Sequence, residues 1–263
     1  MESPEKVSDY IIKWLTDYAE KSNMTGFIIG ISGGIDSALT STLCAMTKKA
    51  VLCLEMPIKQ KEDQLIRSSK HIEWLESKFK NVSSIRLNLD SVFDSFCSIL
   101  PKSKNQHAHE LSLANTRARL RMTSLYYFAA LNNYLVAGTG NKVEDFGVGF
   151  YTKYGDGGVD LSPIADLTKT QVFDLASHLN IIDIIQKAPP TDGLWNDQRT
   201  DEDQLGATYP ELEWAMNTDG KNLNYSALNS RQKQVLEIFK QHFIQNQHKM
   251  QPIPVCKIPL AFI

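Results

Sequence analysis

Short hydrophobic runs alternate with longer amphipathic stretches along most of the chain. Four of these runs predict β-strands, at residues 26–31, 51–56, 82–89 and 134–138. Helical spacing of apolar residues between the runs predicts helices at 38–46, 62–79, 92–100 and 114–133. Strands that alternate with helices predict an α/β fold, a mostly parallel, doubly wound sheet with helices on both faces. In such a sheet, ligands bind beyond the carboxyl ends of the strands.

Both ends of the chain carry amphipathic helical patterns. Near the N-terminus the apolar positions are Val7, Tyr10, Ile11, Trp14, Leu15 and Tyr18. This spacing predicts a first helix that docks by its aromatic stripe. Near the C-terminus, residues 230–247 predict a helix with Val235, Ile238 and Phe239 turned inward, ended by the prolines of 252–255.

Two polar segments interrupt the pattern, at residues 101–110 and 189–209. Loops this long in a compact domain are usually lids or binding loops, so we expect both to order when ligand binds. No internal repeat is visible. We therefore expect residues 1–263 to form a single domain.

Composition narrows the class of protein. The 263 residues carry a formal net charge of −2, with 42% hydrophobic and 22% charged residues, as in ordinary globular proteins. A near-neutral balance argues against a general nucleic-acid binder. No apolar run approaches the roughly 20 residues that cross a bilayer, and no secretory signal is visible. The four cysteines, Cys44, Cys53, Cys97 and Cys256, form no C-x-x-C pair and predict buried reduced thiols in a cytoplasmic protein.

The first chemical signal is the string from Gly30 to Ser37, Gly-Ile-Ser-Gly-Gly-Ile-Asp-Ser, between a predicted strand and a predicted helix. Glycines let backbone N–H groups turn toward a phosphate, and the helix N-terminus adds partial positive charge. Asp36 suits such a site beside a cation, which predicts Mg²⁺ next to a polyphosphate. The lysine of a Walker A loop is missing. The string resembles the pyrophosphate loop of the ATP-pyrophosphatase family, whose members adenylate a substrate and release PPi.

A second cluster narrows the resemblance. It comprises Gly138-Thr139-Gly140-Asn141-Lys142-Val143-Glu144, then Thr152-Lys153-Tyr154-Gly155-Asp156-Gly157-Gly158-Val159-Asp160. These strings resemble the NAD synthetase family over roughly residues 7 to 254, together with Asn115–Met122, Lys169, Pro189–Thr191, Asp201-Glu202 with Gly206 and Tyr209, and His248-Lys249. That family converts deamido-NAD to NAD: the nicotinate carboxylate attacks ATP, and ammonia then displaces AMP. The implied fold is adenine nucleotide alpha hydrolase-like.

The resemblance implies a role for individual residues. ATP contacts are implied for Gly30, Ile31, Ser32, Gly33, Gly34, Ile35, Asp36, Ser37, Thr139, Lys169 and Thr191. Contacts with deamido-NAD are implied for Arg119, Lys153, Asp160, His248 and Lys249. The implied Mg²⁺ ligands are Asp36 and Glu144.

The chain departs from the family spacing at one point. One extra residue lies between Glu144 and Lys153, within 145–150, which makes Asp145 a rival for the metal. We keep Glu144 as the ligand, because the string Gly-Thr-Gly-Asn-x-x-Glu is the fixed part of the motif.

The nitrogen source and the assembly also follow from the resemblance. Glutamine-dependent relatives carry an additional glutaminase domain, and the synthetase match leaves no room for one in this chain, so we expect free ammonia as the donor. Asp156 is our candidate for the carboxylate that takes a proton from the incoming amine. The family also implies a homodimer, with no nucleic-acid or membrane partner.

Simpler interpretations remain open for several of these residues. As a bare pattern, Arg117, Arg119 and Arg121 are typical of a solvated helix face, and His107-x-His109 of ordinary exposed histidines. The rival functions are another adenylating amidotransferase, a tRNA-modifying ATP pyrophosphatase, or a non-catalytic nucleotide sensor. The first two give no reason for the string from Thr152 to Asp160, and the presence of both Mg²⁺ carboxylates and the basic residues argues against a sensor.

Overall fold

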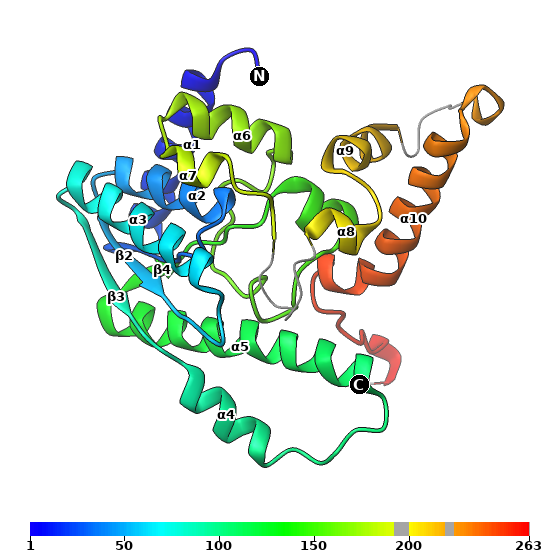
Figure 1. Ribbon diagram of the computed structural model, residues 1–263, viewed down its shortest axis with the longest axis horizontal. Helices are drawn as coiled ribbons and strands as arrows, with labels where there is room; N and C mark the ends of the chain where they lie inside the picture. Colours follow the sequence, from blue (N-terminus) through cyan, green and yellow to red (C-terminus); the bar gives the residue numbers. More distant parts are fainter. Residues whose placement is uncertain (192–199, 219–223, 263) are drawn as a thin grey trace.

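Four parallel strands form the sheet on which the rest of the chain is built. The computed structural model describes residues 1–191, 200–218 and 224–262 (Figure 1). The sheet order is β3-β2-β1-β4, with β1 at Gly26–Gly30, β2 at Ala50–Glu55, β3 at Val82–Arg86 and β4 at Tyr134–Val136. Its register pairs Ile28 with Leu52 of β2 and with Val136 of β4. The predicted α/β fold with a doubly wound parallel sheet is therefore confirmed.

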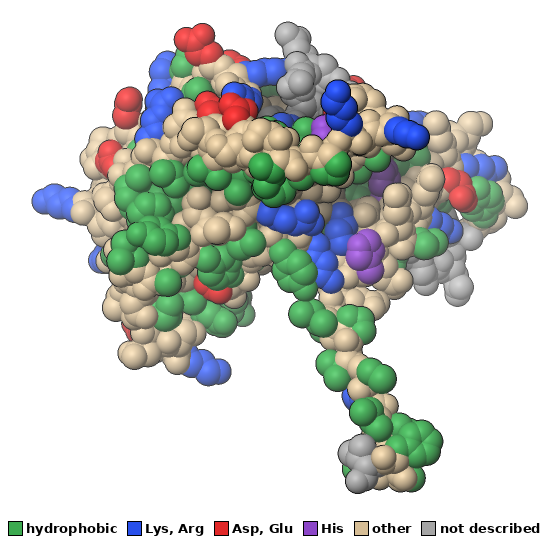
Figure 2. All heavy atoms as spheres, turned by 90° about the horizontal axis from the view of Figure 1, so that it is seen from below, with side chains coloured by type: hydrophobic (Ala, Val, Ile, Leu, Met, Phe, Trp, Pro, Cys, Tyr) green, Lys and Arg blue, Asp and Glu red, His purple; other side chains and the backbone are tan. Residues whose placement is uncertain are grey.

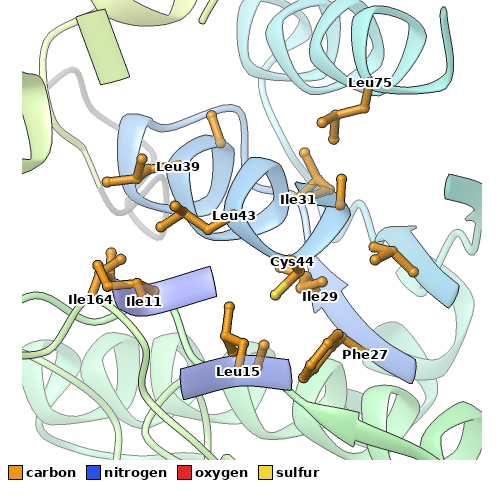
Figure 3. Close-up of a cluster of buried hydrophobic side chains, with 14 of the residues drawn as sticks. Ile11, Leu15, Phe27, Ile29, Ile31, Leu39, Leu43, Cys44, Leu75 and Ile164 are labelled. Atoms are coloured by element: carbon orange, nitrogen blue, oxygen red, sulfur yellow. The ribbon is translucent and has the colours of Figure 1, made fainter. Parts of the chain in front are cut away.

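Alternate side chains of β1 pack into two separate hydrophobic cores, one on each face of the sheet. Phe27 and Ile29 pack against the face covered by α1 (Pro4–Lys21), α2 (Ile35–Met46) and α6 (Lys169–His178), which Figure 3 shows around Leu39 and Leu43. Ile28 points the other way and packs under α4 (Asp90–Ser98) and α5 (Gln106–Asn132). Successive side chains of a strand point to opposite faces of the sheet. Because helices cover both faces here, the strand is hydrophobic at successive positions.

The remaining helices complete the layers. On the α2 side lie α3 (Glu62–Lys78) and the short α7 (Asp183–Gln186). A smaller third core joins the π-helix η1 (Val143–Val148), α8 (Asp201–Leu205), α9 (Tyr209–Thr218) and α10 (Ser230–Met250), which gather at one side of the sheet in Figure 1. Two short 3₁₀ turns, η2 and η3, lie at Tyr225–Ala227 and Leu260–Phe262. No described helix is long and apolar enough to cross a membrane.

The first helix docks by the aliphatic part of the predicted stripe, since Ile11 and Leu15 are buried and Val7 packs on the core, but its aromatic rings stay outside. Its buried residues are Ser8, Ile11, Leu15 and Ala19, whereas the side chain of Tyr10 is 73% exposed. Both sets of residues satisfy the helical period. The stripe that contains Ser8 and Ala19 lets α1 pack closely on α2, and the larger aromatic rings remain at the surface.

Three further expectations need correction. Helix α5 begins at Gln106, so half of the predicted 101–110 loop is helical, because the Asn105 side chain accepts a hydrogen bond from the N–H of Ala108 and caps the helix. In α10, Ile238 packs on the core as predicted but is only partly buried, and Leu236, which was not predicted, is buried with Val235 and Phe239. All four cysteines are free, but Cys97 is half-buried and Cys256 is exposed. Residues 192–199 of the second predicted loop lie outside the described residues.

Candidate active site

A cavity of about 260 Å³ opens at the carboxyl ends of β1, β2 and β4, and the whole string from Gly30 to Ser37 lines it. Gly33 has a φ of +82°, and a Cβ atom there would stand 2.8 Å from the carbonyl oxygen of Gln64. Only glycine fits both the conformation and the close approach. The Oγ atoms of Ser32 and Ser37 lie 3.0 Å apart, so the hydroxyls cross-link the two ends of the loop. The result is a rigid turn that leads into the N-terminus of α2, an arrangement suited to anions.

Three charged side chains, one of them from this loop, meet in the cavity. The ammonium of Lys169 lies 2.5 Å from Oδ2 of Asp36 and 3.1 Å from Oε1 of Glu144. Burial alone lowers the pKa of Lys169, but the charges of Asp36 and Glu144 outweigh it, so that its pKa is raised overall. Lys169 therefore stays cationic and holds the two carboxylates together.

Neighbouring side chains fix the direction of both carboxylates. Asn141 donates from Nδ2 to Oδ1 of Asp36 at 3.1 Å, while its own Oδ1 accepts the N–H groups of Val143 and Glu144. The buried Tyr209 donates its hydroxyl to Oε1 of Glu144 at 2.5 Å. We predicted no role for Asn141 or Tyr209 from the sequence, although both are among the residues that resemble the family. Their function depends on side-chain contacts that spacing along the chain does not reveal.

Two carboxylates converging on one point can also hold a small cation. Mg²⁺ typically takes one or two protein carboxylates and fills its other positions with water and phosphate oxygens. Asp36 and Glu144 therefore fit Mg²⁺ beside a polyphosphate, at the place where both now reach the ammonium of Lys169. Across the described ranges, no group of three or more Asp, Glu, His or Cys side chains is arranged to bind a metal on its own.

The segment in which the family spacing predicts one extra residue overlaps the π-helix η1, at Val143–Val148. A π-helical turn contains one more residue than an α-helical turn, so it could take up a single insertion without shifting the flanking elements. Glu144 lines the cavity, whereas the carboxylate of Asp145 packs on Gly140, where a Cβ atom would stand 2.1 Å from Oδ1. Burial, followed by the nearby charge of Glu144, raises the pKa of Asp145 to about 8.

Asp156 lines the same cavity from the turn at Gly155–Gly158. Its Oδ1 accepts the N–H of Thr152 at 2.9 Å, which orients the carboxyl group. Asp156 is exposed as a residue, but the protein around its carboxyl group partly removes it from water, which raises its pKa; the hydrogen bond from Thr152 only partly opposes this. Of the other residues with implied ATP contacts, Thr139 and Thr191 line the cavity as well.

Four basic residues with implied dinucleotide contacts form a separate cluster outside the cavity lining. The guanidinium of Arg119 donates to the carbonyl of Lys153 at 3.3 Å, and Nζ of Lys153 donates to the carbonyl of His248 at 2.9 Å. Lys249 donates to the carbonyl oxygens of Gly149 and Tyr151. The cluster joins α5 to the end of α10, where Figure 2 shows blue and purple side chains together at the base of a thin arm.

Asp160 lies apart from that cluster. Its Oδ1 accepts the hydroxyl of Tyr126 at 3.0 Å, and its Oδ2 accepts the N–H of Val136 at 2.8 Å. These contacts tie β4 to α5, so the structure gives Asp160 a scaffolding role alongside any contact with ligand.

A half-buried arginine lies on the wall near the end of β2, and the sequence did not single it out as a ligand contact. Arg121 lines the cavity and donates to the carbonyl of Met56 at 3.0 Å and to Oε1 of Gln60 at 2.8 Å. Burial, together with the like charge of Arg117, lowers its pKa to about 10. Its helical spacing with Arg117 is compatible with a solvated face, so no local signal in the sequence places Arg121 on the cavity wall.

Comparisons with known proteins converge on one family. Residues 7–253 match the family described as NAD synthase. The NH(3)-dependent NAD(+) synthetase of Carboxydothermus hydrogenoformans is 38% identical over 215 residues, which cover 80% of this chain and 84% of the relative. The enzyme of the same name from Syntrophomonas wolfei is 35% identical, over 98% of each chain.

A solved structure agrees with this assignment. The NMN synthetase from Francisella tularensis superposes with a TM-score of 0.83 at 30% identity. The match covers 97% of this chain and 99% of that one, so the two chains share the same architecture throughout.

Proposed function

The chain belongs to the NAD synthase family, and on that premise we propose that it is an ammonia-dependent ligase that converts deamido-NAD to NAD. In the first step, the nicotinate carboxylate attacks the α-phosphorus of ATP and PPi leaves, giving an acyl-adenylate. In the second, ammonia attacks the acyl carbon, AMP leaves and one proton is lost. Adenylation is needed because a free carboxylate is a poor acyl donor.

The observation that supports this proposal best is the shared cavity. The Gly30–Ser37 loop, Lys169 and Asp156 all line it, so phosphate-binding and proton-accepting groups surround one space. In the proposal, the loop and the N-terminus of α2 hold the ATP phosphates. Lys169 supplies positive charge as negative charge grows on the leaving pyrophosphate.

Magnesium is part of the proposal. Asp36 and Glu144 would hold it, with Asn141 and Tyr209 keeping their oxygens in position. When bound, Mg²⁺ would neutralise charge on the pyrophosphate and make it a better leaving group. Lys169, which bridges the same two carboxylates, would then turn its ammonium toward the phosphates.

The nucleophile must be NH₃, because NH₄⁺ has no free electron pair. Asp156 faces the cavity with a raised pKa, which suits a carboxylate that accepts a proton near neutral pH. We therefore give Asp156 the role of proton acceptor. Free ammonia as the donor is supported by the names of the similar enzymes.

The basic cluster and the assembly complete the proposal. Arg119, Lys153, His248 and Lys249 would bind the anionic groups of the dinucleotide, and Asp160 its polar groups.

We expect a homodimer in which residues 1–263 are one synthetase domain. A cytoplasmic location is supported by the four free cysteines.

One observation favours an alternative to deamido-NAD as the carboxylic acid substrate. The similar structure from Francisella tularensis is an NMN synthetase, and it matches nearly the whole chain. Nicotinic acid mononucleotide carries the same nicotinate carboxylate as deamido-NAD. It is therefore the alternative acid for the same two chemical steps.

A product assay tests the function and chooses between the acids. The purified chain receives ATP, Mg²⁺ and ammonium or glutamine, with deamido-NAD in one series and the mononucleotide in another. We expect NAD and AMP in equal amounts from deamido-NAD with ammonium. A higher kcat/KM for the mononucleotide would transfer the function to NMN synthesis, and no amide from either acid would reject the proposal.

A further inference from the structure

Acidic side chains outnumber basic ones around the cavity. Among the described residues that line it, the acidic ones are Asp36, Glu55, Glu144, Asp156 and Asp201, and the basic ones are Arg67, Arg121 and Lys169. A triphosphate is itself strongly anionic, so its binding calls for a cation that no carboxylate already neutralises. The loop from Gly30 to Ser37 contributes none, because the lysine of a Walker A loop is missing from it.

Two of the three basic side chains already have strong partners. The ammonium of Lys169 lies between the carboxylates of Asp36 and Glu144, which neutralise it. The guanidinium of Arg121 is tied to the wall near β2 by its bonds to the carbonyl of Met56 and to Gln60. Arg67, which no step of the proposed reaction uses, is the third.

Arg67 reaches the middle of the phosphate loop from a neighbouring helix. Helix α3 lies beside α2 (Figure 1), and Gly33 packs directly on it, because a Cβ atom at Gly33 would stand 3.1 Å from the Cβ of Arg67. Nε of Arg67 donates to the carbonyl oxygen of Gly33 at 3.3 Å. The side chain is only 13% exposed, so bulk water screens its charge weakly.

The ion pair that Arg67 makes is a weak one. Its Nη1 lies 2.8 Å from Oδ2 of Asp63, one turn earlier on α3. The side chain of Asp63 is 65% exposed, and ion pairs with such exposed partners contribute little. A phosphate can therefore compete for the guanidinium, whose planar fork is able to bind two phosphate oxygens at once.

We propose that Arg67 binds the β- and γ-phosphates of ATP and then the pyrophosphate that leaves. Its Nε stays on the carbonyl of Gly33, and its two terminal nitrogens turn to phosphate oxygens. Helix α3 thus supplies the positive charge that the loop lacks, at the place where negative charge grows during adenylation. This inference rests on the proposed function and is independent of which acid is amidated.

Binding measurements on the full-length chain test the contact without turnover. Calorimetry compares ATP, inorganic pyrophosphate and AMP, each with Mg²⁺ and without the acid substrate. Arg67→Gln keeps an N–H donor at the position of Nε, for the carbonyl of Gly33, but removes the charged fork. It should weaken the binding of ATP and of pyrophosphate about ten- to a hundredfold, as expected for a lost hydrogen bond between charged groups. The affinity for AMP should not change, because AMP lacks the two outer phosphates.

Lys70→Met is the matched control. It removes one positive charge from an exposed position of the same helix, outside the cavity lining, and should bind all three ligands as the unmodified chain does. Unchanged binding of ATP and pyrophosphate by Arg67→Gln would show that Arg67 only braces the loop. An equal loss for AMP would show that the substitution distorts the site. Either result would overturn the inference, whereas an unmodified chain that binds no pyrophosphate would also reject the proposed phosphate site.

Asp63→Asn tests the same contact in the opposite direction. The substitution removes the carboxylate that competes with phosphate for Arg67, so pyrophosphate should bind as tightly as before or more tightly. A loss of affinity as large as that in Arg67→Gln would show that the Asp63–Arg67 pair serves the loop and not the ligand.

Discussion

The chemistry of the candidate site depends on one buried cation and the carboxylates around it. Lys169 is 3% exposed and bonds to Asp36 and Glu144, which lie 133 and 25 positions away in the chain. Breaking a buried pair by removing one partner costs about 3–5 kcal/mol, because an uncompensated charge remains. Each residue of this group therefore supports both the fold and the proposed reaction, and variants need controls for folding.

The choice between Glu144 and Asp145 is open to a direct test. Glu144→Ala should abolish Mg²⁺-dependent adenylation, because it removes a carboxylate that lines the cavity. Asp145→Ala should retain it, since Asp145 packs on Gly140 instead. The measurement is PPi release over a range of Mg²⁺ concentrations, with circular dichroism as the folding control. The reverse pattern would make Asp145 the ligand.

Asp156→Asn separates the two steps of the reaction. The substitution keeps the shape of the side chain and its contact with Thr152 but removes the proton acceptor. General-base catalysis contributes about 10²–10⁴-fold, so amide synthesis near pH 7 should fall by at least about a hundredfold while adenylation continues. Asp166→Asn, at a side chain that is 96% exposed, is the matched control. Full amide synthesis by Asp156→Asn at neutral pH would remove the assigned role.

His71 should make the stability of the protein depend on pH. Burial lowers its pKa from 6.5 to about 4, so between these values the unfolded chain binds more protons than the folded one. The stabilisation is complete above pH 6.5 and is lost as the pH falls toward 4, by roughly 3 kcal/mol at 1.36 kcal/mol per pKa unit. Urea unfolding of the native chain and His71→Gln measures this as a difference. Equal pH slopes in the two proteins would contradict it.

At the scale of elements, the hydrophobic pattern predicted which segments are strands and helices better than it predicted their faces and ends. The aromatic and the small-residue stripes of α1 share one period, so the pattern alone does not say which of them docks. The start of α5 depends on a single cap at Asn105. The π-helix η1 was not predicted, and the sequence indicated only one extra residue in the same segment. In each case the outcome is decided by packing or by a local hydrogen bond, which periodicity does not encode.

The turn between β1 and α2 should be sensitive to a single methyl group. Gly33→Ala would place a Cβ atom 2.8 Å from the Gln64 carbonyl at a φ of +82°, and should lower the free energy of unfolding by at least about 1–2 kcal/mol. Gly34→Ala is the matched control, because Gly34 has a φ of −96° and a Cβ there would stand 3.3 Å from Ser32 Oγ. Urea unfolding compares the two variants. Equal stabilities would show that the turn is not constrained as described.

At the scale of the whole molecule, the sheet explains how distant motifs come to share one cavity. The strings after β1 and β4 meet because these strands are neighbours in a parallel sheet and end at the same edge. Alternating strands and helices predicted that edge as the place of the ligands. The same pattern did not predict Arg121 or Gln60 on the wall near β2, or that Asp160 ties β4 to α5. Those positions follow from side-chain directions within the folded layers.

The central claim is that this cavity activates the carboxylate of a nicotinate nucleotide by adenylation. The most direct measurement is the exchange of radiolabelled pyrophosphate into ATP, with Mg²⁺ present and ammonia left out. We expect exchange that requires deamido-NAD or its mononucleotide analogue and that disappears in Glu144→Ala. Exchange without either acid, or no exchange in their presence, would contradict the formation of an acyl-adenylate on this chain.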